Sequence, residues 1–238
     1  MRYLSLLILT QAINNQFCIM KRLFILLLCL TLGSIALHAH VINYELDEMK
    51  SHQVIWNYIK IGYQHIIPFG LDHILFILCV FFLNTNIKQI VLQASMFTVA
   101  HTLTLGLAMY GIIHPPGRII EPLIALSIVL LALENIFSKK VKPWRLVMVF
   151  IFGLVHGMGF AGALSQLGLP SYAFATALIS FNVGVELGQL SIILLMYALV
   201  AKPLSHKMYY RKVIVLPSSI LIAAVAAFWT IERIYASF

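Results

Sequence analysis

The amino-acid sequence predicts an all-α fold, a polytopic transmembrane helix bundle of about six spans that follows an N-terminal signal sequence. Hydrophobic residues make up 61% of the 238 residues, charged residues only 10%, and the mean hydropathy is +0.96. Soluble domains contain about 45–50% apolar and about 25% charged residues, so a soluble fold of this length could not bury so much apolar surface. A lipid bilayer removes that requirement.

The N-terminal residues 1–39 are predicted to form a signal or targeting segment. A basic pair, Lys21 and Arg22, precedes an apolar stretch that is short for a span, and Ala39 offers a cleavage position. Met20 is an alternative start of translation, and an uncleaved first anchor is the other interpretation.

Residues 40–66 are more polar and are predicted to be a short periplasmic segment. The spacing of apolar residues such as Val54, Tyr58 and Ile61 predicts an amphipathic helix that lies at the membrane surface.

Six apolar segments make up the predicted membrane domain, residues 67–238. Turn-forming or charged residues separate neighbouring segments. The segments are 70–86, 88–111, 119–137, 144–167, 172–200 and 213–235.

The basic residues between these segments predict the orientation. With the mature N-terminus outside, the cytoplasmic side carries Lys88, Lys139, Lys140, Lys142, Arg145, Lys202, Lys207, Arg211 and Lys212, and the outer side only Lys50, Lys60, Arg118 and Arg233. The positive-inside rule then predicts a multi-pass membrane protein with both termini outside. The same rule explains the net charge of +8. We do not expect nucleic-acid binding, because the sequence shows no basic face and no aromatic–basic platform.

Ionisable and polar side chains lie within the predicted spans, where a charge costs about 2.5–3.5 kcal/mol on insertion scales. Candidate metal ligands are Asp72, His73, His101, His156 and Glu186. Supporting candidates are His65, Glu121, Glu134, Asn182 and Gln189.

The chemistry of these side chains suits a divalent transition metal, because imidazole favours nickel, cobalt, zinc and copper and carboxylates add charge. At a rise of about 1.5 Å per residue, the candidates would follow one another in depth, from Asp72 and His73 at the outer mouth to Glu186 well inside. Such a ladder of single ligands predicts a permeation path, since a path needs several sites that bind and release. Convergence of the histidines on one point would instead indicate a discrete metal site.

Two alternatives to a permease stay open. One is an intramembrane metal-dependent hydrolase, in which histidines and an aspartate hold zinc and activate water. The other is a non-catalytic membrane assembly partner whose buried polar residues only join helices.

The candidate residues lie in stretches by which the chain resembles the HupE/UreJ family of bacterial membrane proteins, in particular its second subgroup. The matching stretches are 62–76, 97–105, 121–127, 134–135, 152–161 and 181–189. The resemblance implies a permease for nickel, or cobalt, with the metal as substrate or bound ion and no permanent cofactor; zinc is a further possibility. The chain departs from other members in the wider spacing of His65 and Asp72 and in having only His156 in a later histidine stretch.

Overall fold

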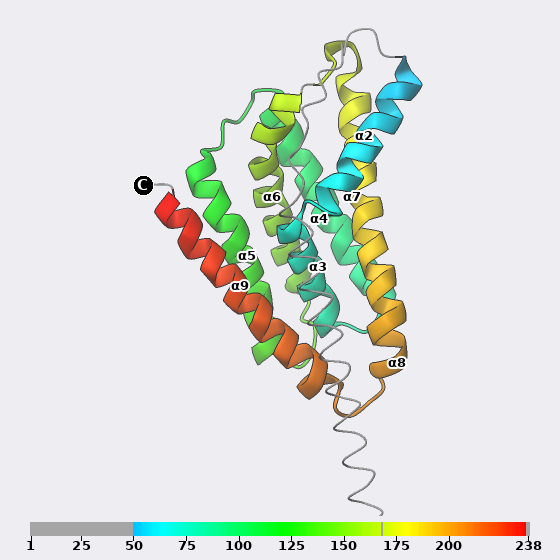
Figure 1. Ribbon diagram of the computed structural model, residues 1–238, viewed down its shortest axis with the longest axis vertical. Helices are drawn as coiled ribbons and strands as arrows, with labels where there is room; N and C mark the ends of the chain where they lie inside the picture. The colour runs from blue at the N-terminus through cyan, green and yellow to red at the C-terminus, as the bar shows by residue number, and fades with distance from the viewer. Residues whose placement is uncertain (1–49, 168, 237–238) are drawn as a thin grey trace, which may run out of the picture.

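The computed structural model describes residues 50–167 and 169–236, and this part of the chain forms a bundle in which every regular element is helical (Figure 1). The predicted signal segment, and the start of the segment 40–66, lie outside the described residues. The long helices are α2 (Ser51–Ile66), α3 (Leu71–Leu83), α4 (Ile87–Met109), α5 (Gly117–Phe137), α6 (Arg145–Leu167), α7 (Phe174–Met196) and α9 (Leu216–Ala236). The short elements are η2 (Ser171–Ala173), η3 (Tyr197–Ala201), α8 (Lys202–Leu204) and η4 (Arg211–Val215).

Five of the helical stretches are long and apolar enough to cross a membrane, and α2 with α3 forms a sixth candidate that bends by 69°. The other five candidates are Ile87–Met109, Gly117–Phe137, Arg145–Ser165, Phe174–Leu204 and Arg211–Ala236. The predicted all-α membrane bundle of about six spans is therefore confirmed.

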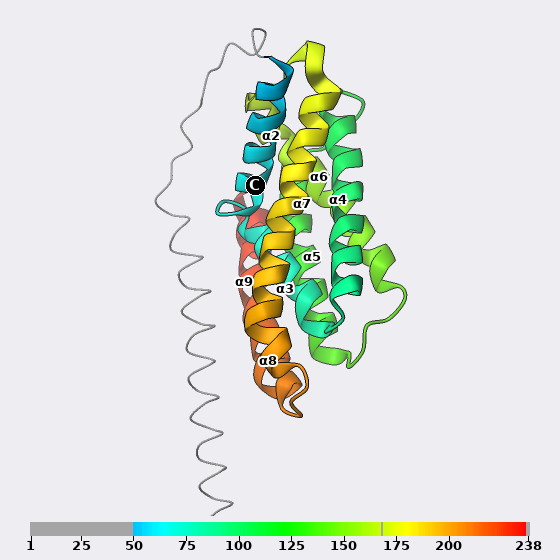
Figure 2. The ribbon, with the colours of Figure 1, turned by 90° about the vertical axis from the view of Figure 1, so that its right-hand side faces the viewer.

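The first span differs from the sequence expectation of a straight segment over 70–86. Helix α3 has only 13 residues, about 20 Å at 1.5 Å per residue, which falls short of a hydrocarbon core of about 30 Å. Together with α2 it reaches the necessary length, so the pair has the form of one broken span. The amphipathic helix expected in 40–66 is present as α2, but its buried face packs along α7 (Figure 2).

Glycines permit the close contact of α2 with α7. A Cβ atom added to Gly62 would collide with the carbonyl of Phe181, and one added to Gly184 would collide with the carbonyl of Ile59. Small residues at helix contacts are typical of membrane proteins, where van der Waals packing holds helices together.

Helix α3 occupies the centre of the bundle and contacts α4, α5, α7 and α9 (Figure 1). Every residue from His73 to Phe82 is buried, which explains why this stretch is apolar all round rather than on one face. The helices α4 and α6 pack together on one side of it, and α5 and α9 on another.

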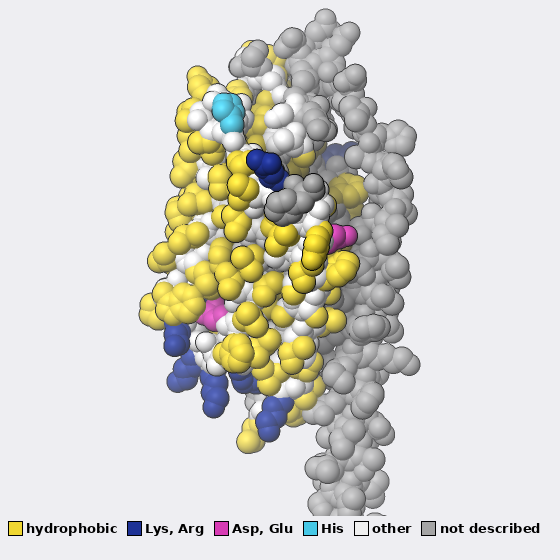
Figure 3. Space-filling model, turned by 90° about the vertical axis from the view of Figure 1, so that its left-hand side faces the viewer, with side chains coloured by type: hydrophobic (Ala, Val, Ile, Leu, Met, Phe, Trp, Pro, Cys, Tyr) yellow, Lys and Arg dark blue, Asp and Glu magenta, His cyan; other side chains and the backbone are white. Residues whose placement is uncertain are grey.

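Apolar side chains cover much of the face seen in Figure 3, and lysine and arginine gather at its lower end. The connections 84–86, 138–144 and 202–210 lie at this end of the bundle, which we call the basic end.

The contact of α4 with α6 depends on Gly157, whose Cβ position is filled by the His101 carbonyl and the Thr104 hydroxyl. We expect Gly157→Leu to separate the two helices and lower the free energy of unfolding by about 1–3 kcal/mol, as overpacking does. Gly162→Leu is the matched control, because no atom lies within 4 Å of a Cβ at that position on the same helix. Thermal unfolding in detergent measures both, and an equal effect of the two variants would contradict this account of the contact.

Candidate metal site

Four histidines from four helices meet near the middle of the bundle. They are His65 at the end of α2, His73 at the start of α3, His101 on α4 and His156 on α6, and we call them the histidine cluster. One ligand nitrogen from each of His65, His73 and His101 lies within 4.8 Å of the others. The His156 ring is centred 5.2 Å from that of His73. The four histidines are therefore on separate helices but close together.

Hydrogen bonds at Nδ1 orient two of these rings. The Asn182 amide donates to the Leu178 carbonyl (2.8 Å), which turns its Oδ1 toward His101 Nδ1 at 3.3 Å. The Nδ1 of His156 lies 2.8 Å from the Phe152 carbonyl. Since both acceptors are oxygens, the network assigns the hydrogen to Nδ1 and leaves the Nε2 lone pair free. This tautomer is the one that an Nε2 metal ligand requires.

The Nε2 atoms of all four histidines are buried and have no hydrogen-bond partner among the described residues. Buried side-chain nitrogen and oxygen atoms nearly always have a partner, so four exceptions in one cluster need an explanation. Imidazole nitrogens bound to one ion at about 2.0–2.1 Å lie at most about 4.2 Å apart. Small side-chain shifts would therefore bring three of them onto a single transition-metal ion.

Phenylalanine rings surround the histidine cluster. Phe97 stacks on His101 and contacts His73 and His156 edge-on, with ring centroids 4.9–6.1 Å away. Phe160 lies 3.8 Å from His65, centroid to centroid. An apolar shell of this kind limits solvent access and controls the local dielectric around a metal site.

The break between α2 and α3 lies beside the cluster, with His65 just before it and His73 just after it. Gly70 permits the tight turn, because a Cβ there would collide with the His65 carbonyl. Binding sites in membrane transporters are commonly formed at such interrupted helices, where irregular backbone is buried by protein.

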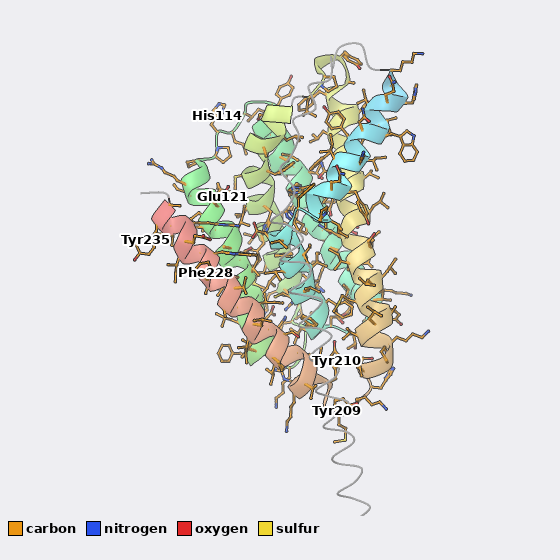
Figure 4. All side chains as sticks on the ribbon, in the orientation of Figure 1. His114, Glu121, Tyr209, Tyr210, Phe228 and Tyr235 are labelled. Carbon is orange, nitrogen blue, oxygen red and sulfur yellow. The ribbon has the colours of Figure 1, made fainter. Side chains whose placement is uncertain are left out.

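Asp72 does not join the histidine cluster, although the sequence placed it beside His73 as a ligand. Both of its carboxylate oxygens accept from the Arg233 side chain of α9, at 2.9 and 3.1 Å. Glu121, on α5 (Figure 4), lies 3.8 Å from the same arginine. His114 is exposed in the loop between α4 and α5, at one end of the bundle (Figure 4). Both carboxylates thus lie beside Arg233.

Glu134 belongs to a separate buried network near the basic end. Its partner is Arg145, which is fully buried and also donates to Gln93 (3.0 Å), Asn135 (3.2 Å) and the Cys79 carbonyl (2.9 Å). Sequence reasoning counted Arg145 among the loop charges and missed this role. Its position one residue inside the apolar segment 144–167 is the signal that could have shown it.

Glu186 and Gln189 lie on α7 beyond the histidine cluster, toward the basic end. Glu186 accepts hydrogen bonds from Ser95 and Thr98 of α4, and among the described residues no hydrogen bond or ion pair joins it to a histidine. Of the ten candidates, the structure therefore brings together His65, His73, His101 and His156, with Asn182 as a positioning residue. The convergence of three histidines indicates a discrete metal site, while the ladder of single ligands down to Glu186 stays a prediction.

These features define a class: a polytopic membrane protein with a buried imidazole cluster at the centre of its helix bundle. A family model described as HupE / UreJ protein matches residues 41–233, and the chain belongs to this family. Comparisons with curated proteins and with solved structures gave no match.

Proposed function

We propose that this protein is a permease that carries a divalent transition-metal ion, nickel or cobalt, across the bacterial inner membrane. The observation that supports this most is the histidine cluster: four buried Nε2 atoms without partners among the described residues, with ligand nitrogens of His65, His73 and His101 within 4.8 Å of one another. Membership of the HupE/UreJ family supports transport as the role of that site.

The ligand chemistry suits reversible binding. Imidazole binds nickel, cobalt and zinc well, and the cluster contains no carboxylate that would add a strong electrostatic attraction. Conduction requires a site that attracts the ion and also lets it leave. A neutral cluster of histidines on four separate helices meets both needs, because a small movement of one helix removes a ligand.

The convergence of three imidazoles also meets the ligand requirement of a zinc hydrolase. Such an enzyme needs, in addition, a carboxylate or similar base beside the metal-bound water. The nearest candidate in sequence, Asp72, binds Arg233 instead, and the carboxylate of Glu186 is hydrogen-bonded to Ser95 and Thr98. We therefore favour transport.

A purely structural role as an assembly partner is less well supported. Polar groups that join membrane helices do so by hydrogen bonding across the contact, as Arg145 does with Glu134. The histidines do not bond one another through Nε2.

The test is uptake of radioactive nickel or cobalt by cells that lack their own high-affinity transporters. Cells that express the protein should accumulate the ion, and His73→Ala and His101→Ala should reduce accumulation to background because each removes a central ligand. His114→Ala, in the exposed loop, should not. Unchanged uptake in both cluster variants, at equal amounts of protein in the membrane, would refute the proposal.

A further inference from the structure

A second polar site, which we call the oxygen cluster, lies between α4 and α7. It contains Ser95, Thr98, Glu186 and Gln189. Ser95 Oγ lies 2.6 Å from Glu186 Oε1, and Thr98 Oγ1 lies 2.5 Å from Glu186 Oε2. The Gln189 Oε1 atom lies 3.3 Å from the same threonine oxygen.

The oxygen cluster has more acceptors than donors. Thr98 has one hydroxyl hydrogen, yet three acceptor oxygens lie within 3.3 Å of it: Ala94 O, Glu186 Oε2 and Gln189 Oε1. Gln189 is fully buried, and its Nε2 has no partner among the described residues. With the amide turned over, Gln189 would donate to Thr98, and Ser95 and Thr98 would still donate to the Glu186 carboxylate. In both orientations the two hydroxyl oxygens lie at the Glu186 carboxylate, and carboxylate and hydroxyl oxygens are ligands that a hard divalent cation takes.

The charge of Glu186 is also uncompensated. Asp72, Glu121 and Glu134 each lie within 4 Å of an arginine. Glu186 takes part in no ion pair within residues 50–236 as described. A carboxylate inside a membrane span is costly and commonly marks an ion pathway, where it pairs with what passes.

The oxygen cluster adjoins the histidine cluster. On α4, Ser95, Thr98 and His101 follow one another every third residue. The facing residues of α7 are Asn182, Glu186 and Gln189, at i, i+4 and i+7, so each set lies on one side of its helix. His101 of the histidine cluster contacts Asn182, which lies on the same face of α7 as Glu186. Along the helix axes, the oxygen cluster lies roughly 5–6 Å from this contact, toward the basic end.

We infer that the oxygen cluster is a second binding site for the same divalent cation, reached after it leaves the histidine cluster toward the basic end. The inference rests on the proposed function. Carboxylate, hydroxyl and amide oxygens are harder ligands than imidazole and hold nickel or cobalt less tightly, while they suit manganese. A weak site after a tighter one is what release requires. The oxygen cluster is therefore the exit site of the path.

The test is metal binding by the purified full-length protein in detergent, measured by equilibrium dialysis with Co²⁺. The wild type should bind two equivalents, one tighter and one weaker. Glu186→Gln, which keeps the shape of the side chain, should lower the affinity of the weaker equivalent about tenfold or more and leave the tighter one unchanged. Thr98→Val, a second variant of similar shape, should weaken the same equivalent. Ser191→Ala, another hydroxyl position on α7, is the matched control.

A second probe separates the two sites. Mn²⁺, followed by its electron paramagnetic resonance signal, should bind to the wild type and to His101→Ala but not to Glu186→Gln. A single Co²⁺ equivalent in the wild type, or a weaker equivalent that is unaffected by both oxygen-cluster variants, would overturn the inference. Loss of the proposed function has a different signature, the absence of a tighter equivalent sensitive to His101→Ala.

Discussion

Replacing His101 with alanine is expected to abolish tight binding of Co²⁺ or Ni²⁺ to the purified protein. His101 is fully buried, contributes one of three convergent nitrogens, and has the free Nε2 atom that a metal requires. Alanine removes the ligand without offering another. Isothermal titration calorimetry at neutral pH, where imidazoles are available as neutral ligands, measures the loss.

Replacing Asn182 is expected to weaken metal binding only in part. It does not belong to the convergent group, but its Oδ1 holds the tautomer and orientation of His101. Replacement of a partner that orients a metal-binding histidine costs about 10–100-fold in affinity, so Asn182→Leu should weaken binding by that amount and not abolish it.

The control is a histidine that lies away from the histidine cluster. His206→Ala, in the exposed connection before α9, should bind as the wild type does. Wild-type affinity in His101→Ala would show that the histidine cluster is not the metal site. Complete loss of binding in Asn182→Leu, with the fold intact, would make Asn182 a ligand instead of a positioning residue.

Replacing Arg145 with alanine is expected to lower the free energy of unfolding by about 3–5 kcal/mol, the usual cost of breaking a buried ion pair. The guanidinium joins four helices: it lies on α6 and bonds to Cys79 of α3, Gln93 of α4, and Glu134 and Asn135 of α5. Its removal leaves the Glu134 carboxylate buried without a cation. Urea unfolding in mixed micelles measures the change.

The double variant Glu134→Gln with Arg145→Met tests the cause. It removes both charges and keeps most of the volume, and replacement of a whole buried pair by neutral groups is often tolerated. Recovery of most of the lost stability relative to Arg145→Ala is expected. A double variant as unstable as Arg145→Ala would mean that lost packing, not the unpaired carboxylate, accounts for the effect.

The predicted spans agreed well with the structure wherever a helix crosses the bundle without interruption. The segments 119–137 and 144–167 correspond closely to α5 and α6, because length and hydropathy suffice to recognise a straight span. The first span was misjudged at its boundary. Its first half, α2, is polar enough to resemble a surface helix. Only the tertiary structure shows that α2 packs along α7 as part of the bundle.

The sequence shows which ionisable residues lie within the spans, but it does not show which of them lie together in space. An ionisable residue in a span is conspicuous in a sequence, and His73, His101 and His156 were found in this way. His65 was treated as a supporting residue because it appeared to lie at the surface, yet it is one of the three convergent ligands. Asp72 and Glu134 were assigned without their arginine partners, which lie 161 and 11 residues further along the chain.

The sequence by itself determined that this protein is a helical membrane bundle of the HupE/UreJ type with polar residues at fixed places along its helices. Hydrophobicity and periodicity are local properties, so they can be read from consecutive residues. Only the tertiary structure decided which of those residues face one another, because facing depends on helix bends and crossings that join distant parts of the chain. The 69° bend lies between His65 and His73, Gly157 brings α6 against α4 beside His101, and the ligand nitrogens of His65, His73 and His101 come within 4.8 Å of one another.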